Sequence, residues 1–288
     1  MNRVLPILVV LAAILALWYV AVVPMNAGWT IAQAERAGHD LTFADVVADT
    51  MNQDRPRLPA PHQVAAELKK TVLDTKVTSK RSLVFHGWIT LQSTLWGFAL
   101  GTTVGIGMAV SIVYSRTANM SLMPWAIISQ TIPIVAIAPM IIVVLATLGV
   151  EGRTVPKAII SAYLCFFPVL VSMVKGLRSP GAMQIDLMKT YSANAGQTFW
   201  KLRLPASMPY LFTSLKVGIA AALVGTIVGE LPTGAIQGLG ARILIGDQFG
   251  NPLMIWSALI AAACLAGALV TIVTVLQSLA LQRMGYAR

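Results

Sequence analysis

The chain has 288 residues, of which 57% are hydrophobic and 11% are charged, and its formal net charge is +10. Soluble domains usually carry about 25% charged residues, so this composition excludes an ordinary soluble domain and indicates a polytopic membrane protein. The positive charge does not indicate nucleic-acid binding, because the basic residues are scattered at the ends of apolar runs without a basic stripe or interleaved aromatic residues.

Residues 1–24 are predicted to form the first transmembrane helix. The run Val4–Val23 contains about twenty apolar residues, which is enough to span a bilayer and longer than the roughly 7–15 residues of a secretory signal. We expect this helix to be retained, with its N-terminus inside. Residues 25–86 follow as a polar segment, expected on the outer side, with an amphipathic helix that begins near Pro61 and continues through Leu68 and Val72.

Residues 87–288 are predicted to form a core of five further spans. The second span, Trp88–Tyr114, places glycines at four-residue spacing, and this pattern predicts close approach of another helix: Gly97, Gly101 and Gly105. The third span, Met120–Leu148, contains three prolines that would break its straightness. Gln130 and Thr131 lie beside one of them, Pro133, and would either form an interhelical hydrogen bond or contact solute.

The remaining spans are expected at Ala158–Val174, Leu211–Gly229 and Pro252–Leu279, with an outer re-entrant or loop segment at Gln237–Asn251. The fifth of the six spans carries Gly225 within a second stripe of small residues and ends at Glu230. A carboxylate near the bilayer boundary costs less than one at its centre. Glu230 would therefore either hold the turn at Pro232-Thr233-Gly234 or line the outer mouth.

The distribution of charge predicts the topology. In short loops and termini, basic residues outnumber the single acid Asp186, and these residues are Arg3, Arg116, Lys175, Arg178, Lys189, Lys201, Arg203, Arg283 and Arg288. Positive residues concentrate on the cytoplasmic side. We therefore predict six spans with both termini in the cytoplasm.

The cytoplasmic loop 180–210 is the least apolar part of this core. Its polar, basic stretch Asp186–Pro209 would form a helix from Asp186 to Trp200, on which Leu187, Tyr191 and Ala195 recur every four residues. Phe199 and Trp200 would offer two large rings to a partner, with Lys201 and Arg203 at the rim of the contact. Pro205 is predicted to end this helix.

This loop resembles the EAA loop of the permeases of bacterial ABC importers. In that motif an acid and two small residues precede a glycine six positions after the acid, and an aliphatic-x-Leu-Pro sequence follows. In this chain Leu202-Arg203-Leu204-Pro205 provides the ending, Asp186 the acid and Ser192 the glycine position. Leu187-Met188 and Ser192 depart from the pattern in a way that is similar to the nitrate/sulfonate/taurine-like subfamily. Leu58-Pro59-Ala60-Pro61 and Phe166-Phe167-Pro168 also resemble features of that subfamily.

The resemblance implies a type I importer permease fold of six transmembrane helices in the bacterial inner membrane. It implies that the loop is a coupling helix that fits a cleft on a separate ATPase and transmits its closure. The residues expected to carry that coupling are Asp186, Tyr191, Ser192, Phe199, Trp200, Leu202, Leu204 and Pro205. The implied partners are an ATPase dimer, a periplasmic solute-binding protein and a second permease chain, expected to be identical. Candidates for the translocation pathway are Gln130, Thr131 and Glu230.

Several motifs are absent from the sequence. No G-x-x-x-x-G-K-[ST] motif occurs, so we expect ATP only on the partner and no cofactor on this chain. The sequence has no H-E-x-x-H, G-x-S-x-G or C-x-x-C motif, so no catalytic residue or metal site is predicted. The alternative functions are a secondary transporter, which would need coupling-ion acids near the midplane, and a membrane-bound enzyme.

Overall fold

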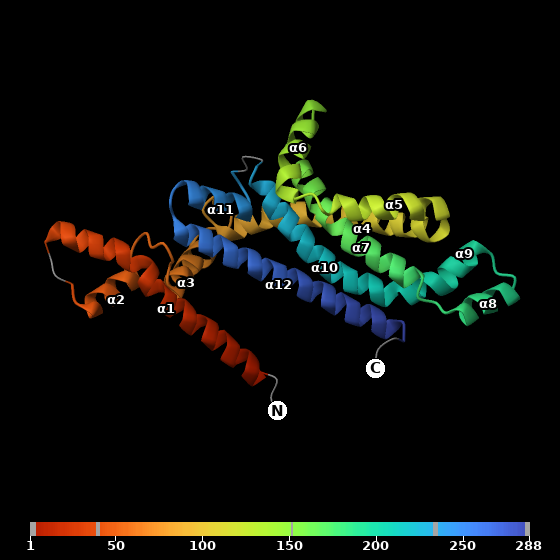
Figure 1. Ribbon diagram of the computed structural model, residues 1–288, viewed down its shortest axis with the longest axis horizontal. Helices are drawn as coiled ribbons and strands as arrows, with labels where there is room; N and C mark the ends of the chain where they lie inside the picture. Colours follow the sequence, from red (N-terminus) through yellow and green to blue (C-terminus); the bar gives the residue numbers. More distant parts are fainter. Residues whose placement is uncertain (1–3, 39–40, 151, 233–235, 286–288) are drawn as a thin grey trace. The chain divides into compact units, whose positions relative to one another are not determined.

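The computed structural model describes residues 4–38, 41–150, 152–232 and 236–285, and all regular structure in these ranges is helical. Helices long and apolar enough to cross a membrane are α1 (Val4–Ala37), α4 (Leu83–Tyr114), α7 (Thr154–Leu177), the continuous helix Ala195–Glu230 that contains α10 (Leu204–Glu230), and α12 (Pro252–Arg283). The predicted all-α membrane fold is confirmed (Figure 1).

The predicted third span is divided into two helices. These are α5 (Arg116–Ser129) and α6 (Ile134–Thr147), which meet at an angle of 105°. Pro133 immediately precedes α6 and cannot donate a backbone hydrogen bond to α5, so the helix breaks there. Counting this bent pair as one span gives six candidate spans in the described part of the chain.

The described residues fall into two compact units, and the first comprises those of 1–86 and 241–262. Its longest helix, α1, has 34 residues and is therefore about 51 Å long, against about 30 Å of hydrocarbon in a bilayer. The helix continues beyond the predicted end at Val23. Pro24 removes only one backbone hydrogen bond, and the more polar residues that follow remain helical as far as Ala37. Part of α1 must extend beyond the membrane or tilt within it.

The polar segment after α1 is ordered by buried hydrogen bonds. It contains α2 (Phe43–Asn52), α3 (Pro61–Lys69) and the π-helical turn η1 (Lys70–Asp74). The buried amide of Asn26 accepts from the N–H of Leu58 at 3.1 Å and donates to its carbonyl at 2.9 Å. The indole of Trp18 donates to the carbonyl of Pro59 at 3.1 Å. These contacts fasten the chain that leads into α3 along the side of α1. Most of α11 (Leu239–Gln248), a short helix in the predicted outer re-entrant segment, also belongs to this unit.

The second unit comprises residues 87–240 and the described residues of 263–288, and α7 is its central helix. Glycines let the two neighbouring helices approach α7 closely. A Cβ atom on Gly97 of α4 would lie 2.3 Å from the Cβ of Ser161, and one on Gly101 would lie 2.7 Å from the carbonyl oxygen of Ala162. Gly105 is equally close to Phe166, and from the other side Gly225 of α10 would place a Cβ 2.8 Å from the Cα of Ser161. At these positions a side chain would force the helices apart.

The pairing of residues fixes the direction of these helices. Gly97 and Gly105 meet Ser161 and Phe166 in the same order, so α4 and α7 run parallel. Because α4 and α7 are parallel, the chain between them must run back toward the start of α7. Helix α5 is the first part of that chain. Its Asn119 accepts from the guanidinium of Arg178 at 3.0 Å. In contrast, α10 runs antiparallel to α7.

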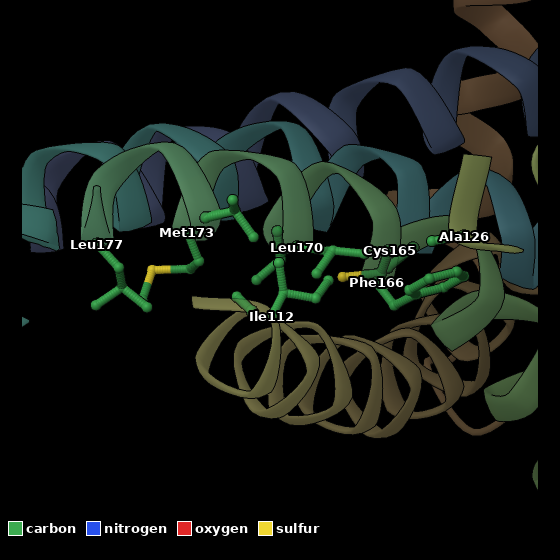
Figure 2. Packing of buried hydrophobic residues seen from close by; sticks show 11 residues of the cluster. Ile112, Ala126, Cys165, Phe166, Leu170, Met173 and Leu177 are labelled. Atoms are coloured by element: carbon green, nitrogen blue, oxygen red, sulfur yellow. The ribbon is translucent and has the colours of Figure 1, made fainter. Parts of the chain in front are cut away.

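The core of this unit lies along α7. Side chains of this helix form a buried row with residues of α4 and α5, and Figure 2 labels Ile112, Ala126, Cys165, Phe166, Leu170, Met173 and Leu177. The row continues to the C-terminal end of α7, where the chain enters the loop with the resemblance described above. The loop is therefore attached to the buried core of the unit.

Candidate functional site

The loop between α7 and α10 contains two helices joined by a turn. These are α8 (Ala182–Thr190) and α9 (Ala195–Thr198), so the prediction of one helix from Asp186 to Trp200 was wrong. Ser192 in the turn has a left-handed backbone with φ of 52°. Asn194 then begins α9 by accepting from the N–H of Gln197 at 2.8 Å. Serine and asparagine side chains favour such turns and caps over helix interiors, which explains the interruption.

The prediction that Pro205 ends the helix was also wrong. The π-helical turn η2 (Phe199–Arg203) connects α9 to α10, and the helix is continuous from Ala195 to Glu230. Pro205 is the second residue of α10 and follows η2 within this continuous helix. In η2, just before this proline, the N–H of Leu204 donates to the carbonyl of Phe199. This bond spans five residues instead of the four of an α-helix.

Several large apolar side chains of the loop are exposed to solvent. Met183, Leu187 and Tyr191 recur every four residues, and their exposed fractions are 86%, 55% and 76%. Trp200 on η2 is 67% exposed. Asp186 is also exposed and forms an ion pair with its neighbour Lys189, at 2.9 Å. We call Met183, Leu187, Tyr191 and Trp200 the loop surface.

Two residues expected to contact a partner instead contact their own chain. Phe199 packs against the ring of Tyr114, with ring centroids 6.0 Å apart, at the edge of the buried core. Arg203 donates to the carbonyl of Leu177 at 2.9 Å and lies over the same tyrosine ring. Phe199 is thus not freely offered to a partner, and Arg203 is not a rim residue. Both hold the base of the loop against α4 and α7.

The other members of the predicted coupling set are half-buried in the helix that follows. They are Leu202, Leu204 and Pro205. Their place in η2 and the first turn of α10 gives them a part in joining the loop to the membrane helix rather than in the exposed surface.

The residues predicted beside the break of the third span have local roles in this structure. Thr131 donates its hydroxyl to the carbonyl of Ile128, 2.8 Å away in the preceding turn. Gln130 ends α5, and its buried Nε2 has no hydrogen-bond partner among the described residues. Within the described part of the chain, no interhelical hydrogen bond from either side chain is seen.

Glu230 lies at the opposite end of α10 from the loop and is fully buried. Its Oε1 accepts from the hydroxyl of Thr90 at 2.9 Å and from the ammonium of Lys157 at 3.3 Å. Its Oε2 accepts from the N–H of Gly240 at 2.7 Å. The carboxylate is enclosed here rather than lining an open mouth, and it holds the start of α11. The alternative turn includes Thr233 and Gly234, which lie outside the described residues.

The sequence interpretation missed three polar residues of the spans. Lys157 and Thr90 were overlooked. Lys157 near the start of α7 and Glu230 at the end of the antiparallel α10 lie at the same depth in the membrane, and this was the signal that could have paired them. Lys216, near the middle of α10, was overlooked because it lies within an apolar run.

Comparison with known proteins places this arrangement in a family. Residues 101–286 match the model of the "Binding-protein-dependent transport system inner membrane component". A probable ABC transporter permease protein of Haemophilus influenzae is 31% identical over 182 residues, which are 63% of this chain and 69% of that protein. The putative aliphatic sulfonates transport permease protein of Bacillus subtilis is 25% identical over 203 residues, 70% of this chain and 69% of that protein.

The fold is similar to a solved structure, the MetNI methionine ABC transporter in an inward-facing conformation. The TM-score is 0.51 at 21% identity, covering 72% of this chain and 96% of the matched chain. The family match, the ABC permease relatives and the shared fold agree with the resemblance found in the loop. They give no support to a secondary transporter. The chain belongs to the family of inner membrane components of binding-protein-dependent transport systems and is a multi-pass ABC permease subunit of the importer type.

Proposed function

We propose that this permease works as a pair of identical chains whose loop surfaces dock on two ATPase subunits, while a periplasmic binding protein delivers the solute. The observation that carries the docking role is the exposed apolar face of α8 together with Trp200. A short helix with aromatic and aliphatic residues on one side suits a groove on a partner protein. ATP would be bound and hydrolysed on that partner.

The left-handed backbone of Ser192 supports the alignment of the loop with the EAA motif. The motif has glycine at this position, and glycine adopts left-handed backbone without steric cost. A φ of 52° at Ser192 is what such a position requires. The turn therefore sets the angle between α8 and α9 as the motif's glycine would.

The continuous helix Ala195–Glu230 gives the mechanism a lever. Its first turns carry Trp200 of the loop surface, and its later turns pack against α7 within the bundle. A movement of the docked loop would shift α10 as a rigid rod and change access along the bundle. The orientation that suits this mechanism puts the loop and both termini in the cytoplasm, as the distribution of basic residues predicts.

The solute that fits best is a small nitrogenous or sulfonated organic compound. This rests on the relatives, one of which is named for transport of aliphatic sulfonates. Specificity would reside mainly in the binding protein.

The test is reconstitution of the permease in vesicles with an ATPase subunit and a periplasmic binding protein from the same organism. We expect uptake that requires ATP, the ATPase and the binding protein together. Uptake driven by a proton gradient without the ATPase would overturn the proposal. Pull-down of differently tagged permease copies would test the identical pair, and failure to recover both tags in an active complex would contradict it.

A further inference from the structure

A buried ion pair lies at the end of the second unit that is remote from the loop. Lys157 is 3% exposed and Glu230 is fully buried, and their charged groups are 3.3 Å apart. They belong to α7 and α10, the two helices that pack through Gly225. Buried charges are costly unless paired and hydrogen-bonded, so this arrangement favours the conformation in which both helices are in register.

The pair also binds a segment of backbone. Lys157 donates to the carbonyl of Gln237 at 3.3 Å, and Gly240 donates its N–H to Glu230. Thr90 of α4 connects the two, since its hydroxyl donates to Glu230 and accepts from the N–H of Leu239 at 2.9 Å. Residues 237–240 are thus held by side chains of α4, α7 and α10 together.

Glycine is required for this segment to wrap the carboxylate. Gly238 has φ of +127°, and a Cβ atom there would lie 2.1 Å from Oε1 of Glu230. A Cβ on Gly240 would lie 2.5 Å from the carbonyl oxygen of Ile227. The backbone therefore fits closely around one side chain, and this fit would be lost if α10 moved relative to α4 and α7.

The segment and the loop surface are connected by one rigid element. Trp200 and Glu230 lie on the same uninterrupted helix, and thirty residues of helix span about 45 Å. The π-helical turn η2 and Pro209 lie in the loop-side part of this helix, and the helix continues without interruption from there to Glu230. The two ends of the rod are the exposed surface and the buried ion pair.

We infer that Thr90, Lys157 and Glu230 form a lock that holds residues 237–240 across the end of the bundle and is released when α10 is displaced from the loop side. The lock rests on the proposed function only in its link to the ATPase. The three side chains are positioning residues, and the moving part is the segment 237–240 with the start of α11. Release would be part of opening that end of the bundle to solute.

The experiment measures hydrogen exchange of the Leu239 and Gly240 amides in the full-length permease in nanodiscs. Wild type is compared with Glu230→Gln, which keeps the shape but replaces an acceptor oxygen with an amide group, and with Lys157→Met. Lys216→Met is the matched control, because it removes a lysine from a span without touching the lock. We expect exchange at residues 237–240 to rise at least tenfold in the two lock variants and to stay at the wild-type rate in the control. Wild-type exchange in both lock variants would overturn the inference.

A double variant distinguishes the contribution of the ion pair from that of the hydrogen bond between Glu230 and the backbone of Gly240. Lys157→Glu with Glu230→Lys restores opposite charges, but a lysine at position 230 cannot accept from Gly240. We expect this protein to be produced near wild-type level while the segment still exchanges fast. Full protection in the double variant would mean that charge alone holds the segment, contrary to the lock.

The link to transport is tested in wild type with its ATPase bound. Trapping the closed nucleotide state should raise exchange at 237–240. If exchange is fast in the lock variants but does not change with nucleotide in wild type, the cluster only stabilises the fold, and its role in opening is overturned. Failure of the ATPase to bind would contradict the proposed function instead, since the nanodisc measurements do not use it.

Discussion

Arg203 donates a hydrogen bond to the carbonyl oxygen of Leu177 at 2.9 Å and thereby closes the base of the loop between α7 and α10. Hydrogen bonds from charged groups contribute roughly 1.5–3 kcal/mol, and this one also satisfies a carbonyl at the end of a helix. We expect Arg203→Gln to lower the thermal denaturation midpoint of the permease and increase hydrogen exchange in residues 178–203. Lys201→Gln is the control, because Lys201 is exposed two residues away. Equal effects of both changes would contradict the structural role of Arg203.

Trp200 and Phe199 are neighbours with different expected roles. Trp200→Ala should weaken ATPase binding by about 2 kcal/mol, roughly thirtyfold, as for other aromatic anchors, without changing the stability of the free permease. Phe199→Ala should destabilise the free permease by about 2 kcal/mol because it leaves a gap beside Tyr114. Binding by biolayer interferometry and denaturation of the permease alone would separate the two. Loss of binding only on neutralising Lys201 would show attachment by charge.

Ser192→Gly should stabilise the loop by about 0.5–1 kcal/mol. Glycine removes the steric cost of the left-handed backbone, and the greater conformational entropy of glycine in the unfolded chain offsets part of this stabilisation. Ala193→Gly is the control, since Ala193 lacks positive φ and the change there should destabilise. The denaturation midpoints of both variants provide the test. A lower midpoint for Ser192→Gly would argue against the turn.

Gly101→Leu should prevent α4 from packing on α7, because its side chain would meet the backbone of Ala162. Overpacking usually costs about 1–3 kcal/mol, and a backbone obstacle gives little room for relaxation. Gly107→Leu on the same helix has open space and should be tolerated. The yield of monodisperse protein in detergent would decide, and equal yields would mean that the glycine contact is unimportant.

Asp186→Lys should leave the fold intact and uncouple ATP hydrolysis from transport. Asp186 is exposed and its ion pair with Lys189 lies on the surface, so its change should alter stability by less than about 1 kcal/mol. It would reverse the acid in a basic docking segment. Uptake per ATP hydrolysed, measured in vesicles, should fall. Unchanged stoichiometry would remove Asp186 from the docking interaction.

The sequence by itself determined the membrane class, the approximate spans and the family. Composition and apolar runs suffice for the first two, because a bilayer requires long apolar helices whatever their neighbours are. The four-residue spacing of Gly97, Gly101 and Gly105 indicated a close helix contact, and the spacing of Asp186 and Leu204-Pro205 indicated the loop. These patterns are local, so they can be interpreted without a structure.

Only the tertiary structure decided what each polar or aromatic side chain contacts. Phe199 and Trp200 are adjacent in sequence, yet one packs on Tyr114 and the other is exposed, because neighbouring helical residues point in different directions. Pro205 suggested a helix end, whereas the helix continues through it, with the wider register of η2 just before it. Lys157 and Glu230 are 73 residues apart, and only the antiparallel packing of α7 and α10 brings their charges together.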